Sequence, residues 1–135
     1  MSDSLVDRYA SRRAEQREPE ETPDSPDDHG SFGWLRGIRD RAVMLELRFK
    51  DGRVLACGYS WLEAVEFDPS EGITLFFAGR RIQIKGTNLN REVAPNVSLL
   101  GGLIRQRIPW IQEADGGTVL QSLPDICVVD EVKLL

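Results

Sequence analysis

The sequence has 135 residues, enough for one domain of ordinary size but not for two. Its formal net charge is −5, from 17 basic and 22 acidic residues. Residues 1–30 hold nine acidic residues and four arginines, a net charge of −5, so residues 31–135 are neutral, with thirteen residues of each sign. This balance excludes a nucleic-acid binder that depends on net positive charge, but it leaves room for a local basic surface.

The apolar runs are short, and none is long enough for a transmembrane helix. The first twenty residues are polar and charged, so we expect no signal peptide, no membrane partner and a cytoplasmic protein. In that compartment a disulfide is not favoured. Cys57 and Cys127 lie in apolar, strand-like runs, which predicts two free thiols that are buried as small hydrophobic side chains.

The rare residues argue against the common catalytic constellations. His29 is the only histidine and lies in the acidic stretch, whereas histidine-dependent hydrolysis needs a histidine held by a packed scaffold. The two cysteines are far apart and have no zinc-ligand spacing, and no glycine-rich phosphate loop is present. We therefore expect no catalytic residue, no metal and no cofactor. Glu66 and Asp68, two apart on one strand face, leave a carboxylate-based enzyme or a small-ligand site as a third interpretation.

In chain order, the first expected element is an acidic tail over residues 1–31. Residues 18–28 read EPEETPDSPDD, with six acids, three prolines and no large apolar side chain, which predicts disorder. Ahead of them, Ser4 is placed to cap a short helix that ends near Arg17. Two interpretations stay open for this part, a fraying helix and a segment that docks on a partner. Its apolar positions are Leu5, Val6, Tyr9, Ala10 and Ala14.

The folded domain is expected over residues 32–135. Apolar and charged residues alternate over 43–50, which indicates a half-buried strand. Asp51-Gly52 then predicts a two-residue type I′ turn, followed by a return strand over 53–57. Further alternation predicts strands over 64–68, 73–78 and 82–85, so residues 43–85 form a meander of about five strands.

After the meander, Ser98 predicts the start of a helix that ends near Ile108, before Pro109. Residues 126–134 predict a final strand. The expected fold class is therefore mainly β with one helix (α+β). It is a small antiparallel meander or a partly open barrel, with a C-terminal helix and a final strand.

Two stretches resemble the Sm-like family of small RNA-binding barrels. Residues 49–53 (FKDGR) are similar to the turn of that family's first hairpin, and residues 84–89 (IKGTNL) are similar to its second motif. The resemblance implies RNA contacts by Lys85, Gly86 and Asn88 in the pore of a ring. The sequence departs from the family at Ala56, where a glycine is expected, and it has no asparagine shortly after the acid of the first motif. The 43–113 segment is also similar to small, uncharacterised bacterial proteins.

The first functional hypothesis is a non-enzymatic, cytoplasmic protein-interaction module with an unidentified protein partner. The candidate interface residues are Trp34, Arg48, Lys50 and Arg81, because aromatic and arginine side chains are enriched at interfaces. The basic residues of the two hairpins would form one strip if the hairpins were neighbours. The alternative is an Sm-like RNA-binding oligomer. The sequence leaves the oligomeric state open.

Overall fold

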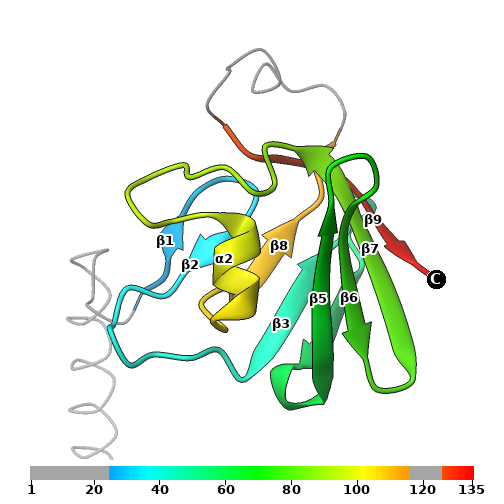
Figure 1. The fold of residues 1–135 in the computed structure, drawn as a ribbon, viewed down its shortest axis with the longest axis horizontal. Coiled ribbons are helices and arrows are strands. Elements are labelled where there is room, and N and C mark those ends of the chain that lie inside the picture. Colours follow the sequence, from blue (N-terminus) through cyan, green and yellow to red (C-terminus); the bar gives the residue numbers. More distant parts are fainter. Residues whose placement is uncertain (1–24, 116–125) are drawn as a thin grey trace, which may run out of the picture.

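The computed structural model describes residues 25–115 and 126–135, which form strands, one short α-helix and one 3-10 turn (Figure 1). This confirms the prediction of a mainly β fold with one helix. None of the helices in these two ranges has the length and hydropathy that crossing a membrane requires. The helical elements are η1 (Tyr59–Trp61) and α2 (Leu99–Ile104). The strands are β1 (Asp27–Asp28), β2 (Gly33–Trp34), β3 (Met44–Arg48), β4 (Val54–Gly58), β5 (Leu62–Asp68), β6 (Gly72–Phe77), β7 (Arg80–Thr87), β8 (Trp110–Gln112) and β9 (Val128–Leu134).

The larger strands form two open sheets rather than one meander. The first has the order β4-β3-β8 and the second the order β5-β6-β7-β9. Of these neighbours, β3 and β8 run parallel and the others antiparallel. The five strands expected over residues 43–85 are all present, but β4 and β5 lie in different sheets because η1 redirects the chain between them. The final strand is β9, which pairs with β7.

One hydrophobic core is enclosed by the two sheets and α2. Alternation along each strand places its apolar positions on the inner face, as in β3, where Leu45 and Leu47 are fully buried between more exposed neighbours. Burying a side chain of this size stabilises the fold by about 1.5–3 kcal/mol. The other fully buried side chains are Phe32, Ile73, Leu75, Ile82, Ile84, Leu99, Leu103, Ile108, Ile111 and Val129.

Glu113 joins the two sheets where β8 ends. Its side chain is buried, and its two carboxylate oxygens accept hydrogen bonds from different backbone amides. Lys50 N–H donates to Oε1 at 2.9 Å and Val132 N–H donates to Oε2 at 2.7 Å. The next residue, Ala114, donates its N–H to the carbonyl of Val129 at 2.8 Å. One short segment after β8 therefore connects the β3–β4 hairpin to β9.

The turn between β3 and β4 differs from the predicted type I′ turn. Gly52 has a φ of +95°, but Asp51 is not among the residues with positive φ, so only one of the two required positions is left-handed. Gly52 N–H donates to the carbonyl of Phe49 at 3.0 Å, and Phe49 N–H donates to the carbonyl of Arg53 at 2.9 Å. This is the three-residue loop in which a type I turn is followed by a left-handed glycine. The Asp51 carboxylate stabilises the loop by accepting from Arg53 N–H at 3.0 Å.

Helix α2 starts where the sequence predicts and ends earlier. The Ser98 side chain caps it by accepting from Gly101 N–H at 3.0 Å. The predicted end was Ile108, whereas α2 ends at Ile104 because Gln106 adopts a left-handed φ of 58°. Arg107 N–H then donates to the carbonyl of Gly102 at 2.8 Å, which is the closing bond of a Schellman motif.

The expected tail is described only in part. Residues 1–24 lie outside the described residues, so the prediction of disorder there stays a prediction. Residues 27–28 form β1, which pairs with β2. The Ser31 hydroxyl donates to the carbonyl of Cys127 at 2.8 Å, which ties the entry of the chain to the start of β9.

Candidate interaction surface

The basic residues named as interface candidates belong to hairpins in two different sheets. Arg48 lies on β3, where its guanidinium is 2.9 Å from the Glu46 carboxylate and 4.5 Å from the centre of the Trp110 ring. Lys50 follows β3 in the turn of the first hairpin. Arg81 lies on β7 in the other sheet, 5.3 Å from the centre of the Phe76 ring. The two hairpins are therefore not joined by strand pairing, which was the arrangement that would favour a single basic strip.

Trp34, the fourth predicted interface residue, is buried with 8% of its surface exposed. Its ring covers α2 so closely that a Cβ atom on Gly102 would lie 2.7 Å from Trp34 Cζ3. The Arg107 guanidinium lies 5.6 Å from the centre of the ring. Trp34 thus packs in the core, and Gly102 is required at this close approach.

Lys85, Gly86 and Asn88 come together at a surface pocket of 290 Å³. The loop that joins β5 to β6 lines the opposite side of this pocket. The register of β7 against β9 shifts between Lys85 and Gly86, which marks a β-bulge. Asn88 has a φ of 58° and donates from Nδ2 to the carbonyl of Ile126 at 2.9 Å.

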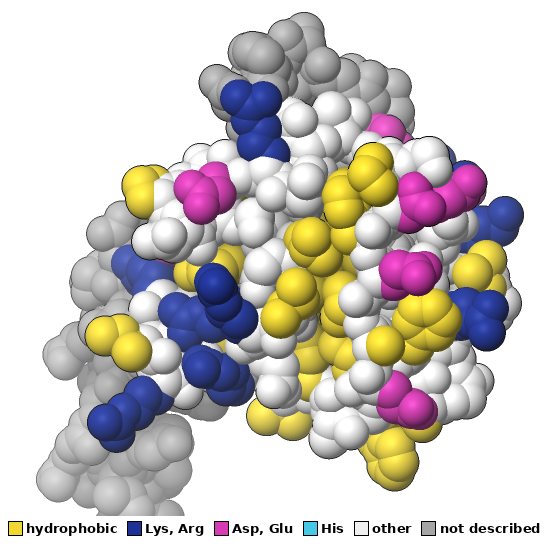
Figure 2. Space-filling view, viewed as in Figure 1, with side chains coloured by type: hydrophobic (Ala, Val, Ile, Leu, Met, Phe, Trp, Pro, Cys, Tyr) yellow, Lys and Arg dark blue, Asp and Glu magenta, His cyan; other side chains and the backbone are white. Residues whose placement is uncertain are grey.

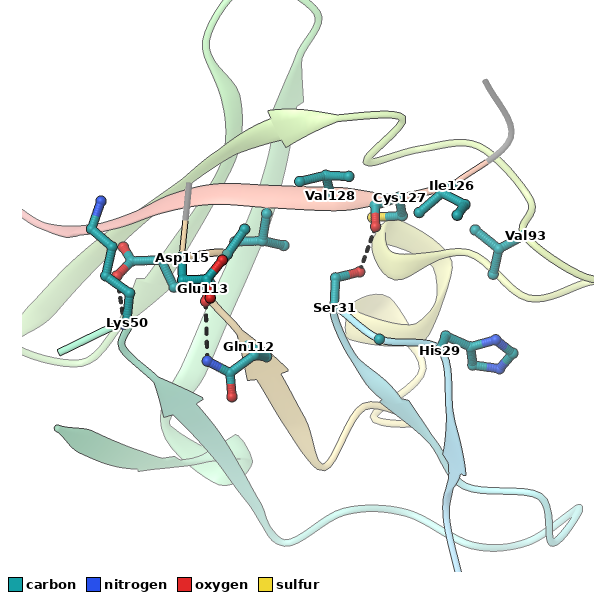
Figure 3. Close-up of a pocket in the computed structure, with 13 residues that line it drawn as sticks. His29, Ser31, Lys50, Val93, Gln112, Glu113, Asp115, Ile126, Cys127 and Val128 are labelled. Atoms are coloured by element: carbon teal, nitrogen blue, oxygen red, sulfur yellow. Dashed lines mark hydrogen bonds between the residues drawn. The ribbon is translucent and has the colours of Figure 1, made fainter. Parts of the chain in front are cut away.

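A larger pocket of 560 Å³ lies beside the start of β9 (Figure 3). The fold engages several of its polar groups: Ser31 and both Glu113 oxygens have the partners given above, and Gln112 donates to the carbonyl of Glu113 at 3.0 Å. The buried Nε2 of His29, by contrast, has no hydrogen-bond partner among the described residues. Burial raises the pKa of the Cys127 thiol to about 11, so this thiol stays protonated at neutral pH. The His29 ring stacks on Phe32 with a centroid distance of 5.2 Å.

The described residues contain no group of three or more His, Cys, Asp or Glu side chains able to hold a metal ion. Cys57 and Cys127 are both free and buried, as predicted. Burial also raises the pKa of Cys57. Neither thiol has the exposure and low pKa of a reactive cysteine.

The surface that the sequence reasoning missed begins with residues 36–41, which connect β2 to β3. Arg107 Nη1 donates to the carbonyl of Gly37 and, at 3.1 Å, to that of Asp40. Arg41 Nη1 donates to the Asp40 carbonyl at 2.9 Å, and Asp40 N–H donates to the Gly37 carbonyl at 3.0 Å. The segment is thus held by several bonds, yet it presents Ile38 with 90% of its surface exposed.

Exposed apolar side chains continue from Ile38 along the start of β3 to η1 and the end of α2. Ala42 N–H donates to the Gln106 carbonyl at 2.8 Å, which places the start of β3 beside the end of α2. Tyr59 N–H donates to the Val43 carbonyl at 2.9 Å, which places the start of β3 beside η1 as well. We call this surface the Trp61 face. Its apolar members and their exposed fractions are Ile38 (90%), Val43 (79%), Met44 (45%), Trp61 (65%) and Ile104 (62%), and its exposed arginines are Arg39, Arg41 and Arg105.

A shallow groove runs along one side of the Trp61 face, between η1 and β5 on one wall and α2 on the other. It measures 430 Å³ and is lined mainly by apolar side chains. The lining residues are Tyr59, Leu62, Glu63, Ala64, Val65, Leu103, Ile104 and Gln106. We call this pocket the α2–β5 groove.

The two sides of this surface carry opposite charges. In Figure 2, dark blue side chains gather on the left, over residues 36–41 and the end of α2, and a yellow strip separates them from acidic side chains on the right. The acids of β5 are Glu63, Glu66 and Asp68, and all three are exposed. In the described part of the chain, no hydrogen bond or ion pair engages the Arg39 or Arg105 side chain. The apolar strip is therefore bordered by arginines on one side and by the acidic side chains of β5 on the other.

A sequence signal for this surface exists, but it is spread over two segments. Residues 36–41 contain three arginines, Arg36, Arg39 and Arg41. Residues 105–107 contain two more, Arg105 and Arg107. The neutral charge of residues 31–135 hides this local excess. Only the contact between the end of α2 and the β2–β3 connection brings the arginines together.

No family model matches the chain, and no curated protein and no solved structure gives a significant match.

Proposed function

We propose that the protein is a non-enzymatic, cytoplasmic interaction module that binds a partner protein through the Trp61 face. The observation that carries this proposal is the set of large apolar side chains held exposed on a hydrogen-bonded surface. Soluble monomers rarely expose contiguous apolar patches without a use for them, and patches with a charged rim are typical of interfaces. Trp, Met and Arg, all present here, are enriched in interfaces.

The rigidity of residues 36–41 supports the same proposal. A loop that must be ordered on binding costs conformational entropy, which lowers affinity. Here Arg107 and Arg41 already bind the backbone carbonyls of Gly37 and Asp40. Ile38 is therefore presented at little further entropic cost.

Affinity purification of the full chain from its native cell tests the proposal. We expect a discrete partner protein to be captured by the native chain and lost from the Trp61→Ala and Ile104→Glu variants. Val54→Glu is the matched control, because Val54 is also exposed, at 58%, but lies at the opposite end of β4 from η1. Capture that is equal for all four chains, or absent for the native chain, would refute the proposal.

The second candidate is an Sm-like RNA-binding oligomer. The pocket that brings Lys85, Gly86 and Asn88 against the β5–β6 loop favours it, because the resemblance assigns RNA contacts to those three residues. If it is correct, Lys85→Ala weakens RNA binding by about 1–3 kcal/mol. We expect no binding of short U- or A-rich RNA at physiological salt. Micromolar binding by the native chain that is lost in Lys85→Ala would place this candidate first.

A further inference from the structure

We propose that the Trp61 face is the docking site of this chain's own residues 4–24, which a partner must displace. In this arrangement the acid-rich residues 18–24 lie on the arginines, and residues 4–17 occupy the α2–β5 groove. The inference rests on the proposed function, because it takes the Trp61 face to be a binding surface, and it adds how access to that surface is controlled.

The point where the described chain begins supports the first contact. Asp27 forms an ion pair with Arg36 at 3.3 Å, so the chain enters the fold beside residues 36–41. The seven residues just before Ser25 include Glu18, Glu20, Glu21 and Asp24 and no basic residue. Fully extended, seven residues span about 24 Å, enough to cross the arginines of one face of a small domain. Charge attraction therefore directs this stretch onto Arg39, Arg41 and Arg105.

The composition of residues 4–17 supports the second contact. They carry four arginines against two acids, a net charge of +2, together with apolar side chains that include Leu5, Val6 and Tyr9. The α2–β5 groove offers an apolar floor, and its β5 wall carries Glu63, with Glu66 and Asp68 further along the strand. A segment that is both apolar and basic fits a groove that is both apolar and acidic.

The order of charges along the chain matches the order of charges on the surface. Read back from residue 25, the chain is first acidic and then basic and apolar. From the point of entry, the surface is first basic, over residues 36–41 and the end of α2, and then apolar and acidic towards β5 (Figure 2). The two sequences of charge are complementary in the same order.

The covalent link makes a weak contact sufficient. Exposed ion pairs are individually weak and are screened by salt. A tethered segment, however, binds at an effective concentration in the millimolar range. Docking of residues 4–24 therefore lowers the apparent affinity of any partner for the Trp61 face, and raising the salt concentration weakens the contact of residues 18–24 first.

Paramagnetic labelling of the full chain tests this inference. A nitroxide is attached at Ser11→Cys, and the native thiols are not labelled because both are buried. We expect the nitroxide to abolish the signals of the Trp61 indole and the Ile104 amide, while the Lys133 amide on β9 keeps its intensity. Adding Arg39→Glu and Arg105→Glu to the labelled chain should restore the lost signals. Arg81→Glu is the matched control, because Arg81 is an exposed arginine on β7 that belongs to neither the Trp61 face nor the α2–β5 groove, and it should restore nothing.

Three results would overturn the inference. The first is full intensity at Trp61 and Ile104 in the labelled chain, and the second is signal loss that the double arginine variant leaves unchanged. The third is signal loss that disappears on dilution, because only a contact between two copies of the chain depends on concentration. If the Trp61 and Ile104 signals keep full intensity in the labelled chain while a partner is still lost from Ile104→Glu, the proposed function stands and only this inference falls. If docking is seen and no partner is captured, the intramolecular contact stands, and the proposed function falls together with displacement by a partner.

Discussion

Removing the Glu113 carboxylate should separate the two sheets. In Glu113→Ala, the N–H groups of Lys50 and Val132 lose their acceptors. A hydrogen bond to a charged group contributes about 1.5–3 kcal/mol, so losing both should lower the free energy of unfolding by about 3–6 kcal/mol. Small domains have only about 5–15 kcal/mol in total, so this variant should be marginally folded.

Glu113→Gln should show an intermediate effect. Each carboxylate oxygen accepts from a different amide, and a glutamine side chain has only one acceptor oxygen. One bond is then lost, at a cost of about 1.5–3 kcal/mol, and an NH₂ group faces an N–H group.

Denaturant unfolding of the full chain measures these costs. Glu66→Ala is the control, since Glu66 is exposed and should change the free energy of unfolding by less than about 0.5 kcal/mol. A change of the same small size in Glu113→Ala would show that Glu113 does not hold the sheets together.

Three further predictions concern stability. Gly52→Val should lower the free energy of unfolding by about 1–3 kcal/mol, because a β-branched residue would have to adopt a φ of +95°. A Cβ atom at this position would meet nothing within 4 Å, so the cost comes from the backbone and not from a clash; an unchanged melting temperature would contradict this. Gly102→Ala should cost about 1–3 kcal/mol despite its better helix propensity, because the new methyl group meets Trp34 and Ile108; a gain in stability by denaturant titration would argue against this packing. Burial raises the pKa of the Cys127 thiol from an ordinary value of 9.0 to about 11, so stability should fall by about 2 kcal/mol as the pH rises from 9 to 11. The fall should be smaller in Cys127→Ala, and an equal fall in both chains would exclude this cause.

Local patterns were enough to predict the longer strands and the helix of this fold, but not the short strands β1, β2 and β8. The alternation over residues 43–50 and the serine before α2 correspond to β3 and to the helix cap. Two local predictions, the turn type at Asp51-Gly52 and the end of α2, were wrong because several backbone conformations are compatible with the same residues. Asp51-Gly52 fits both the type I′ turn and the three-residue loop, and Gln106 gives no sign of the left-handed conformation that ends α2.

The arrangement of the elements was less predictable, because it depends on contacts between distant residues. Nothing in the three residues of β8 signals a strand parallel to β3. Glu113 would be placed on the surface by its type, and only its two amide donors explain its burial. The Trp61 face was missed for the same reason, since its arginines and apolar side chains come from segments far apart in the sequence.

The position of β8 and β9 after β3–β7 in chain order has a consequence for biosynthesis. A ribosome releases residues 44–87 well before the strands that complete both sheets, so β3 and β7 emerge with an unpaired edge. Pairings between distant segments are also slow to form, because they pay a large loop-closure entropy. We therefore expect the two sheets to be completed only after β9 has emerged, and the nascent chain to need protection from aggregation until then.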